Sequence, residues 1–293
     1  MSAVTDGHKE RFEKEINLHS SLDHENIVKF VGAIVHPALV LVTELVTGDT
    51  LTKYLYSIRP QLLDLKLAIS FALDVARAMK YLHGNHIVHR DLKPNNLLLT
   101  EDKRRIKLAD FGMAIEESSN EMNSTAGTYR WMAPEVIRTE DHIVGEKKRY
   151  DRKVDVYSFA IVFWELLTNE LPFNGRHGFQ VAYANVAHNL RPSLENIPNE
   201  LAPFLEACWA ANPKDRPEFV AITHFLGGFL EKLCIADMPP PKLMEVAPLD
   251  TGRATESYKK KRSKHFFDSI IRYESTFNWL SVRLHSLTYP NTE

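Results

Sequence analysis

The side chains best suited to chemistry lie near the middle of the chain. The stretch His89-Arg-Asp-Leu-Lys-Pro-Asn-Asn96 contains a carboxylate, an ammonium and an amide group, and Asp110 adds a second carboxylate. Hard oxygen ligands suit Mg²⁺, so we expect Asn96 and Asp110 to hold this metal. Asp91 is expected to accept or orient the proton of an attacking hydroxyl, and Lys93 to neutralise charge on a phosphate during transfer. This set of residues therefore predicts phosphoryl transfer.

Three motifs follow one another in the order that protein kinases show. The stretch from His89 to Asn96 is followed by Asp110-Phe-Gly112 and then by Ala133-Pro-Glu135, and each is a kinase signature. A single tripeptide such as the second arises often by chance, whereas the ordered set does not. The alternative for the motif set is an unrelated helical enzyme, and the alternative for Asp91 or Asp110 is a solvated acid of a loop. We expect instead a protein kinase that uses ATP and Mg²⁺.

Two further stretches are Gly127-Thr-Tyr-Arg-Trp-Met-Ala-Pro-Glu135 and Asp155-Val-Tyr-Ser-Phe159. Because of these stretches and the catalytic loop, the chain resembles the plant Raf-like MAP kinase kinase kinases over roughly residues 10 to 235. This resemblance implies an ATP site that includes a glutamate of the small-lobe helix, a gatekeeper residue, two hinge residues and the floor of the adenine pocket. In chain order these are Glu15, Thr43, Glu44, Val46 and Leu98.

The same resemblance implies three structural contacts. Asp155 would hold the backbone of the catalytic loop, and Glu135 would pair with Arg216 to brace the larger lobe. A plain surface salt bridge is the alternative for that pair. Thr128 would bond to the catalytic aspartate and lysine through its hydroxyl, a role we consider structural rather than regulatory.

Lys93 also indicates which hydroxyl accepts the phosphate. A lysine at this position resembles serine/threonine kinases, whereas tyrosine kinases usually carry Ala or Arg in this loop. A serine/threonine kinase is therefore expected, with a tyrosine kinase as the weaker alternative. Arg90 is positioned to capture a phosphate bidentately. The candidate regulatory sites in the activation segment, each of which is otherwise a plain loop hydroxyl, are Ser118, Ser119, Ser124 and Thr125.

The elements that must position these residues can be predicted from hydrophobic periodicity. We expect helices over residues 9–22, 62–84 and 154–167, the last apolar all round and therefore central. Two antiparallel strands are expected within residues 27–46, and short strands at 97–99 and 106–108.

These elements predict an α+β, bilobal fold of the protein kinase type, with an incomplete small β lobe and a mainly α-helical large lobe. The predicted units are a partial small lobe, the large lobe and a C-terminal tail, at residues 1–46, 47–235 and 236–293.

The N-terminal region departs from the family pattern. A G-x-G-x-x-G loop and a VAIK-type lysine precede the small-lobe helix in the family, yet only fourteen residues precede Glu15 here and they contain neither motif. Lys9 and Lys14 lie on the same predicted helix and cannot replace that lysine. His19 stands where the family usually has an aliphatic residue, and if buried it needs a hydrogen-bond partner. These departures predict a truncated product, a splice form, or a catalytically weak pseudokinase that acts as a scaffold.

Composition restricts the possible partners and the compartment. The formal net charge of −2 gives no overall reason to bind nucleic acid. The two cysteines, Cys208 and Cys234, are too few for a disulfide framework and indicate a reducing compartment. The chain has no apparent signal peptide and no run of about 18 apolar residues. We therefore expect a cytoplasmic protein with a protein substrate and no transmembrane segment.

The tail has an amphipathic pattern of its own. Apolar residues recur at alternating steps of four and three from Phe266 to Leu287, and a basic run from Lys259 to Lys264 precedes them. This segment, residues 259–287, could contact a partner protein or an anionic membrane. A helix that docks on its own domain, or a segment without structural consequence, is the alternative.

Overall fold

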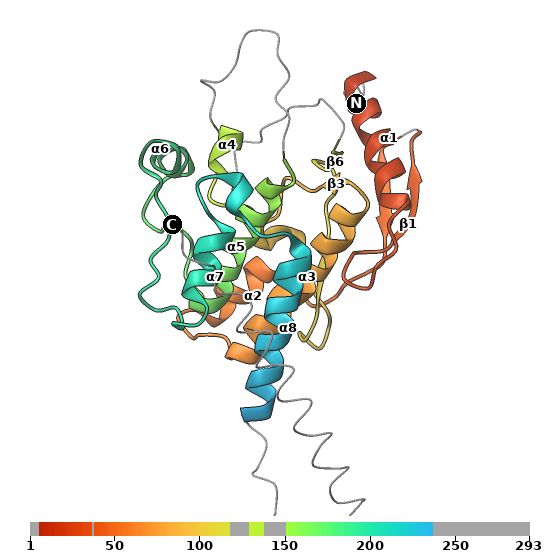
Figure 1. Ribbon diagram of the computed structural model, residues 1–293. Coiled ribbons are helices and arrows are strands. Elements are labelled where there is room, and N and C mark those ends of the chain that lie inside the picture. Colours follow the sequence, from red (N-terminus) through yellow and green to blue (C-terminus); the bar gives the residue numbers. More distant parts are fainter. Residues whose placement is uncertain (1–5, 37, 118–128, 138–150, 237–293) are drawn as a thin grey trace, which may run out of the picture. The chain divides into compact units, whose positions relative to one another are not determined.

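The computed structural model describes residues 6–36, 38–117, 129–137 and 151–236. The chain divides into two compact units, residues 1–238 and 239–293. The first contains all the elements described below (Figure 1), and the boundary predicted between residues 46 and 47 lies inside it. The second lies outside the described residues, as does the predicted amphipathic segment 259–287.

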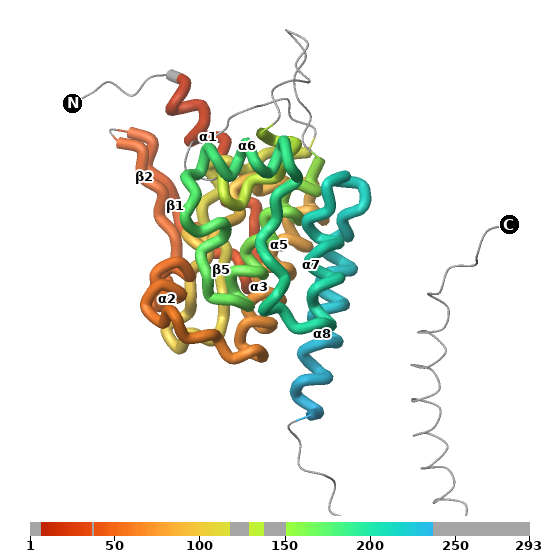
Figure 2. The backbone as a smooth tube through the Cα atoms, turned by 90° about the vertical axis from the view of Figure 1, so that its left-hand side faces the viewer, coloured from red at the N-terminus to blue at the C-terminus, as the bar shows by residue number. Residues whose placement is uncertain are grey.

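One helix and two strands form the N-terminal part of the first unit. Helix α1 (Asp6–Ser20) lies beside strand β1 (Phe30–Ile34), which pairs with β2 (Val40–Thr43) in an antiparallel sheet (Figures 1 and 2). Directly opposed residues such as Ile34 and Val40 share a face of this sheet. The two strands predicted within residues 27–46 are therefore present.

The other seven α-helices among the described residues all follow β2, and α5 lies at the centre of their core. In chain order they are α2 (Leu51–Ile58), α3 (Leu65–Gly84), α4 (Pro134–Ile137), α5 (Lys153–Thr168), α6 (Gly178–His188), α7 (Ala202–Cys208) and α8 (Phe219–Ala236). Every residue of α5 is buried, and it packs against α3 and α7. A helix that is surrounded by protein on all sides is apolar all round, which explains the near-continuous apolar sequence of α5. The predicted α+β fold with a mainly helical large part is confirmed.

The start of α3 differs from the prediction by a few residues. The apolar period had placed it at residue 62, but the helix begins at Leu65 because Asp64 caps it, its Oδ1 accepting from the backbone N–H of Leu67 at 3.1 Å. A side-chain oxygen at this position satisfies one of the N–H groups that the first turn leaves without a partner.

Two short antiparallel pairs hold the segments that carry the first two motifs. Strand β3 (Ile87–Val88) pairs with β6 (Ile115–Glu116), and β4 (Leu97–Leu99) pairs with β5 (Ile106–Leu108). A 3₁₀ turn, η1 (Pro94–Asn96), leads directly into β4. The residues from 89 to 96 thus leave β3 and enter β4, while Asp110 lies between β5 and β6.

Helix α8 is long and apolar enough, by length and composition alone, to cross a membrane, and it is the one such helix among the described residues. Its extensive packing along α3 explains that composition equally well. The ring of Phe219 lies edge-on to His83 and Phe159, with centroids 4.9 and 5.6 Å away, so part of α8 belongs to the core of the first unit.

Candidate active site

Asp91 is held in place by its two neighbours in the loop between β3 and β4. Its Oδ2 lies 2.5 Å from Lys93 Nζ and 3.0 Å from Asn96 Nδ2, and the same amide group donates to the Asp91 carbonyl at 2.9 Å. Asp91 and Asn96 are both largely buried, and the Asp91 side chain keeps 10% of its surface exposed. The carboxylate is therefore fixed in orientation, with a small part of its surface open to solvent.

Asp155 fixes the backbone of the same loop from below. Asp155 lies in the first turn of α5 and is fully buried. Its carboxylate accepts hydrogen bonds from the backbone N–H groups of His89 and Arg90 at 2.9 and 2.8 Å. It also contacts His83 Nε2 at 2.9 Å. Burial opposes ionisation, but these contacts outweigh it and lower the pKa of Asp155. Arg90 adopts a positive φ of 65°, a conformation of a non-glycine residue that needs such external support.

Asp110 lies next to this loop because a backbone hydrogen bond joins its segment to the loop. The N–H of Ala109 donates to the carbonyl of Asn96 at 2.8 Å, and Gly112 donates its N–H to Asp110 Oδ1 at 3.2 Å. Asp110 is exposed and also has a positive φ, of 66°. The two residues predicted to bind metal are thus brought to neighbouring positions of the backbone.

The donors present fit a Mg²⁺ ion. Asn96 uses its amide nitrogen toward Asp91, so its oxygen is the atom free to act as a ligand, and Asp110 supplies an exposed carboxylate. Mg²⁺ in nucleotide sites is typically held by one or two such oxygens together with phosphates and water. Among the described residues there is no cluster of three or more His, Cys, Asp or Glu side chains that would hold a metal alone, so the nucleotide itself would complete the coordination.

Glu15 on α1 faces the same region. A Cβ atom placed on Gly112 would lie 3.4 Å from both Glu15 Oε2 and Asp110 Oδ1, so the two carboxylates flank this glycine. Partial burial raises the pKa of Glu15, and the charge of Asp110 raises it further. A cation close to both groups would relieve this repulsion.

His19 connects α1 to the segment that carries Asp110. Its ring lies 4.7 Å from that of Phe111 and 5.7 Å from that of Phe30, and its Nε2 contacts the carbonyl of Val28 at 2.7 Å. Burial lowers the pKa of His19, which favours the neutral ring. The hydrogen-bond partner that a buried histidine needs at this position is therefore the carbonyl of Val28.

The predicted hinge runs from β2 toward β4. Glu44 Oε1 accepts from the Lys29 N–H at 2.8 Å and from Lys107 Nζ at 2.6 Å. Gly48 passes so close to Thr100 that a Cβ atom would lie 2.1 Å from its carbonyl oxygen, so only glycine fits. Thr43 precedes Glu44 directly and Val46 follows it by two residues, and half-buried Leu98 lies on β4, opposite Lys107 on β5. The segment predicted to be the hinge is thereby held against the strand that carries Leu98.

Glu135 and Arg216 form a bidentate pair. The two carboxylate oxygens accept from the two terminal guanidinium nitrogens at 2.5 and 2.9 Å, and the Arg216 side chain is completely buried. Its Nε also donates to the carbonyl of Ala210 at 2.9 Å. The pair is therefore fully buried at its Arg216 end, while the Glu135 side chain keeps 26% of its surface exposed.

Residues 2–226 match the family described as protein tyrosine and serine/threonine kinase. The chain belongs to this family. The matched range includes all the site residues described above, from Glu15 to Arg216.

Three relatives show how far the likeness extends. The serine/threonine/tyrosine-protein kinase HT1 of Arabidopsis thaliana is 38% identical over 281 residues, which cover 95% of this chain and 67% of HT1. The serine/threonine-protein kinase STY17 of the same plant is 40% identical over 228 residues, covering 76% of this chain and 38% of STY17. Mitogen-activated protein kinase kinase kinase 10 of Mus musculus is 34% identical over 275 residues, which cover 89% of this chain and 27% of that kinase. The chain thus spans about two thirds of HT1 and much less of the other two.

These relatives confirm the predicted likeness to Raf-like kinases and to serine/threonine protein kinases. Nothing in them favours the pseudokinase alternative. The match to HT1 leaves only a small fraction of the chain uncovered, so the similarity continues past residue 226 into the second unit.

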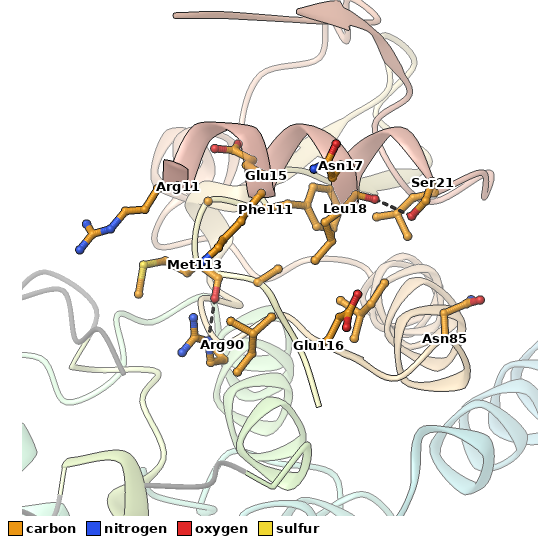
Figure 3. A pocket seen from close by; sticks show the side chains of 16 residues that line it. Arg11, Glu15, Asn17, Leu18, Ser21, Asn85, Arg90, Phe111, Met113 and Glu116 are labelled. Atoms are coloured by element: carbon orange, nitrogen blue, oxygen red, sulfur yellow. Dashed lines mark hydrogen bonds between the residues drawn. The ribbon is translucent and has the colours of Figure 1, made fainter. Parts of the chain in front are cut away.

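A cavity of about 680 Å³ lies between α1 and the segment from Phe111 to Glu116 of the kinase (Figure 3). Leu18 and Phe111 line its apolar middle. Arg11 and Arg90 lie on the side away from Asn85, and Arg90 Nε donates to the Met113 carbonyl at 2.6 Å. The four candidate phosphorylation sites and Thr128 lie outside the described residues.

A second cluster, which sequence reasoning missed, supports the segment from Tyr129 to Ala133. Arg130 donates to the carbonyls of Pro172, Phe173 and Arg176 at 2.7, 2.9 and 2.6 Å. On the inner side, Trp131 donates its indole N–H to Glu165 Oε2 at 3.3 Å, and Arg59 Nη2 donates to Oε1 at 2.9 Å. The partners are 34 and 106 positions away from Glu165 in the chain, so no local pattern reveals them.

Glu165 predicts an unusual pH dependence of the kinase's stability. Burial raises its pKa from 4.5 to about 7, although Arg59 opposes this. Because the folded pKa is the higher one, the contribution of Glu165 to stability is complete below about pH 4.5 and is lost as the pH rises through about 7. Between about pH 5 and 8, we expect wild type to lose on the order of 2 kcal/mol more unfolding free energy than Glu165→Gln.

Denaturant unfolding of both proteins across this pH range, followed by tryptophan fluorescence, measures that difference. All other titrating groups are common to the two proteins, so their effects cancel. Stability curves that run parallel over the whole range would contradict the assignment.

Proposed function

We propose that the chain transfers the γ-phosphate of ATP to serine or threonine hydroxyls of protein substrates. The observation that carries this proposal is the fixed carboxylate of Asp91, held by Lys93 and Asn96 next to the exposed carboxylate of Asp110. Catalysis of this reaction is almost entirely positioning and charge stabilisation. The carboxylate of Asp91, which Lys93 and Asn96 already orient, meets the requirement for positioning.

In the proposed reaction, Asp91 takes the proton of the substrate hydroxyl as its oxygen forms a bond to the γ-phosphorus. The bond from that phosphorus to the β–γ bridging oxygen breaks, and ADP leaves. Lys93 neutralises charge on the phosphoryl group in transfer. Mg²⁺, held through Asn96 and Asp110, would neutralise the phosphate oxygens. The nucleotide would lie along Thr43, Glu44, Val46 and Leu98, with Glu15 at its inner side.

Serine and threonine are the proposed acceptors on the grounds of Lys93. The printed name of HT1 also includes tyrosine, so phosphoamino acid analysis of the product is the appropriate readout. We place the protein in cytoplasmic signalling, a proposal that rests on its Raf-like relatives. A contact of residues 259–287 with a protein surface, in preference to an anionic membrane, remains part of the same proposal.

A regulatory role is proposed for Arg90. Phosphorylation at one of the activation-segment hydroxyls would place two negative charges within reach of its guanidinium. Two observations support this: Arg90 lines the cavity of Figure 3, and Glu116, which also lines it, precedes Ser118 by two positions. The sites proposed for this phosphate are Ser118, Ser119, Ser124 and Thr125.

The metal assignment is tested by Asp110→Asn in the full-length protein. We expect Mg²⁺-dependent phosphate transfer to fall at least about 100-fold, because the substitution removes a ligand charge. The fold should persist, since Asp110 is exposed and its neutral isostere can still accept from the Gly112 N–H. Asp102→Asn, in the exposed turn between β4 and β5, is the matched control. Transfer by Asp110→Asn at the wild-type rate and the same Mg²⁺ requirement would refute the assignment.

A further inference from the structure

Trp131 is attached to two successive turns of α5. Its backbone carbonyl accepts from Ser158 Oγ at 2.7 Å, and its indole N–H donates to Glu165 Oε2 at 3.3 Å. Glu165 follows Ser158 by about two helical turns, so both side chains lie on the same face of α5. Trp131 is 8% exposed and Glu165 is 2% exposed. The tryptophan therefore lies along the side of α5, with a hydrogen bond at each end.

The N-terminal turn of α5 also holds the catalytic loop. Asp155 accepts from two backbone N–H groups of that loop, and Ser158 follows Asp155 by one turn. Side chains three apart on a helix are neighbours, so segment 129–133 lies alongside the catalytic loop. A protein whose hydroxyl reaches Asp91 therefore passes close to segment 129–133.

Arg59 links the same carboxylate to helix α2. It follows the last residue of α2, and its Nη2 donates to Glu165 Oε1 at 2.9 Å while its Nε donates to the carbonyl of Asn169 at 2.7 Å. Because the guanidinium is a rigid fork, it fixes Glu165 and the C-terminal end of α5 together. At its other end α2 contacts the catalytic loop, where Thr52 Oγ donates to Asn95 Oδ1 at 3.0 Å. Helix α2 thus connects the catalytic loop to the carboxylate that holds the tryptophan.

A buried carboxylate is a costly way to fill this space. The charged groups that face Glu165 are Arg59, from the end of α2, and Arg130, from segment 129–133. Burial nevertheless raises the pKa of Glu165 to about 7, whereas an apolar side chain of similar volume would pack here without a charge to desolvate. Stability alone therefore does not account for a glutamate at this position.

We propose that Arg59, Glu165 and Trp131 act as one positioning unit, which holds segment 129–133 in the arrangement that binds the protein substrate. This inference rests on the proposed function. The unit acts through segment 129–133, so it affects the binding of the acceptor protein and leaves the chemistry at Asp91 unchanged.

The test compares full-length wild type with Trp131→Phe, with Arg59→Lys and with the variant that combines them. Phenylalanine keeps an aromatic ring but lacks the N–H that Glu165 accepts. Lysine keeps the positive charge but has no fork that can contact Glu165 and Asn169 together. Steady-state phosphorylation of casein gives KM and kcat for a protein acceptor. Hydrolysis of ATP without casein measures the catalytic residues alone.

The matched control is Trp164→Phe/Arg105→Lys, which makes the same chemical changes elsewhere. Trp164 Nε1 donates to the carbonyl of Ser193 at 2.7 Å, and Arg105 Nε donates to buried Asp74 at 3.0 Å. The control therefore removes an indole N–H and a guanidinium fork from contacts of similar kind that do not include segment 129–133.

We expect each single variant to raise KM for casein about five- to tenfold, the effect of losing one hydrogen bond to a charged group. Its kcat and its ATP hydrolysis without casein should stay within about twofold of wild type. The combined variant should raise KM no further than the single variants, because residues that act as one unit have non-additive effects. The control should match wild type in all three measurements.

An unchanged KM for casein in Arg59→Lys would overturn the inference, since the proposed unit requires Arg59 to act through Glu165. Additive effects of the two substitutions would overturn it as well, and so would an equal fall in ATP hydrolysis without casein, which indicates general damage to the fold. A wild type that neither phosphorylates casein nor hydrolyses ATP would contradict the proposed function itself.

Discussion

Asp91→Asn is expected to reduce kcat by about 10²- to 10⁴-fold, the range that general-base catalysis contributes. The amide is isosteric with the carboxylate and can still contact Lys93 and Asn96, but it cannot take the proton of the substrate hydroxyl. Binding of ATP should change little, because Asp91 acts on the acceptor. The variant therefore separates proton acceptance from positioning of the nucleotide.

Steady-state phosphorylation of a protein substrate gives kcat, and binding of a fluorescent ATP analogue gives the affinity for nucleotide. Asp102→Asn is again the control, since it makes the same chemical change at an exposed turn where Asp102 contacts Thr100 and Arg104. A fall in nucleotide affinity large enough to account for the lost activity would move Asp91 from the acceptor side to the nucleotide side.

Glu135→Ala is expected to destabilise the fold by about 3–5 kcal/mol. The reason is that Arg216, whose side chain is completely buried, would keep its charge without a carboxylate, and an uncompensated buried charge is costly. Denaturant unfolding measures the change. Glu13→Ala is the control, because Glu13 pairs with Lys9 at 3.7 Å on the exposed side of α1, and such pairs contribute below about 1 kcal/mol.

The double variant Glu135→Leu/Arg216→Met distinguishes the charge from the packing. Replacing both partners by apolar residues removes the unpaired guanidinium, so we expect it to recover much of the stability that Glu135→Ala loses. If the double variant is as unstable as Glu135→Ala, the packing of these side chains and not their charge stabilises this part of the large lobe.

Much of the fold could be predicted because its signals are local. The apolar period located α1, α3 and α5, and the Val- and Ile-rich stretch around a proline predicted β1 and β2. The start of α3 was less accurate, since hydrophobic periodicity does not detect the cap that Asp64 provides. Ordered motifs also located Asp91 and Asp110, because phosphoryl transfer requires particular residue types at fixed spacings.

The contacts that were missed are formed between residues far apart in the chain. Arg130 reaches carbonyls more than 40 positions away, and backbone carbonyls leave no mark in a sequence. The exposure of Phe179 and Tyr183 on α6 was equally hidden, because an aromatic pair at helical spacing usually belongs to a core. His19 is an intermediate case: its need for a partner followed from chemistry, but the carbonyl of Val28 could be identified only in three dimensions.

The most direct measurement of the central claim is single-turnover transfer from γ-³²P-ATP by the full-length protein, with wild type and Asp91→Asn examined side by side at saturating nucleotide. Single-turnover conditions isolate the chemical step from product release. The account predicts Mg²⁺-dependent appearance of phosphoserine or phosphothreonine with wild type, and a rate lower by about 10²-fold or more with Asp91→Asn. Equal single-turnover rates for the two proteins, with both fully bound to ATP, would contradict it.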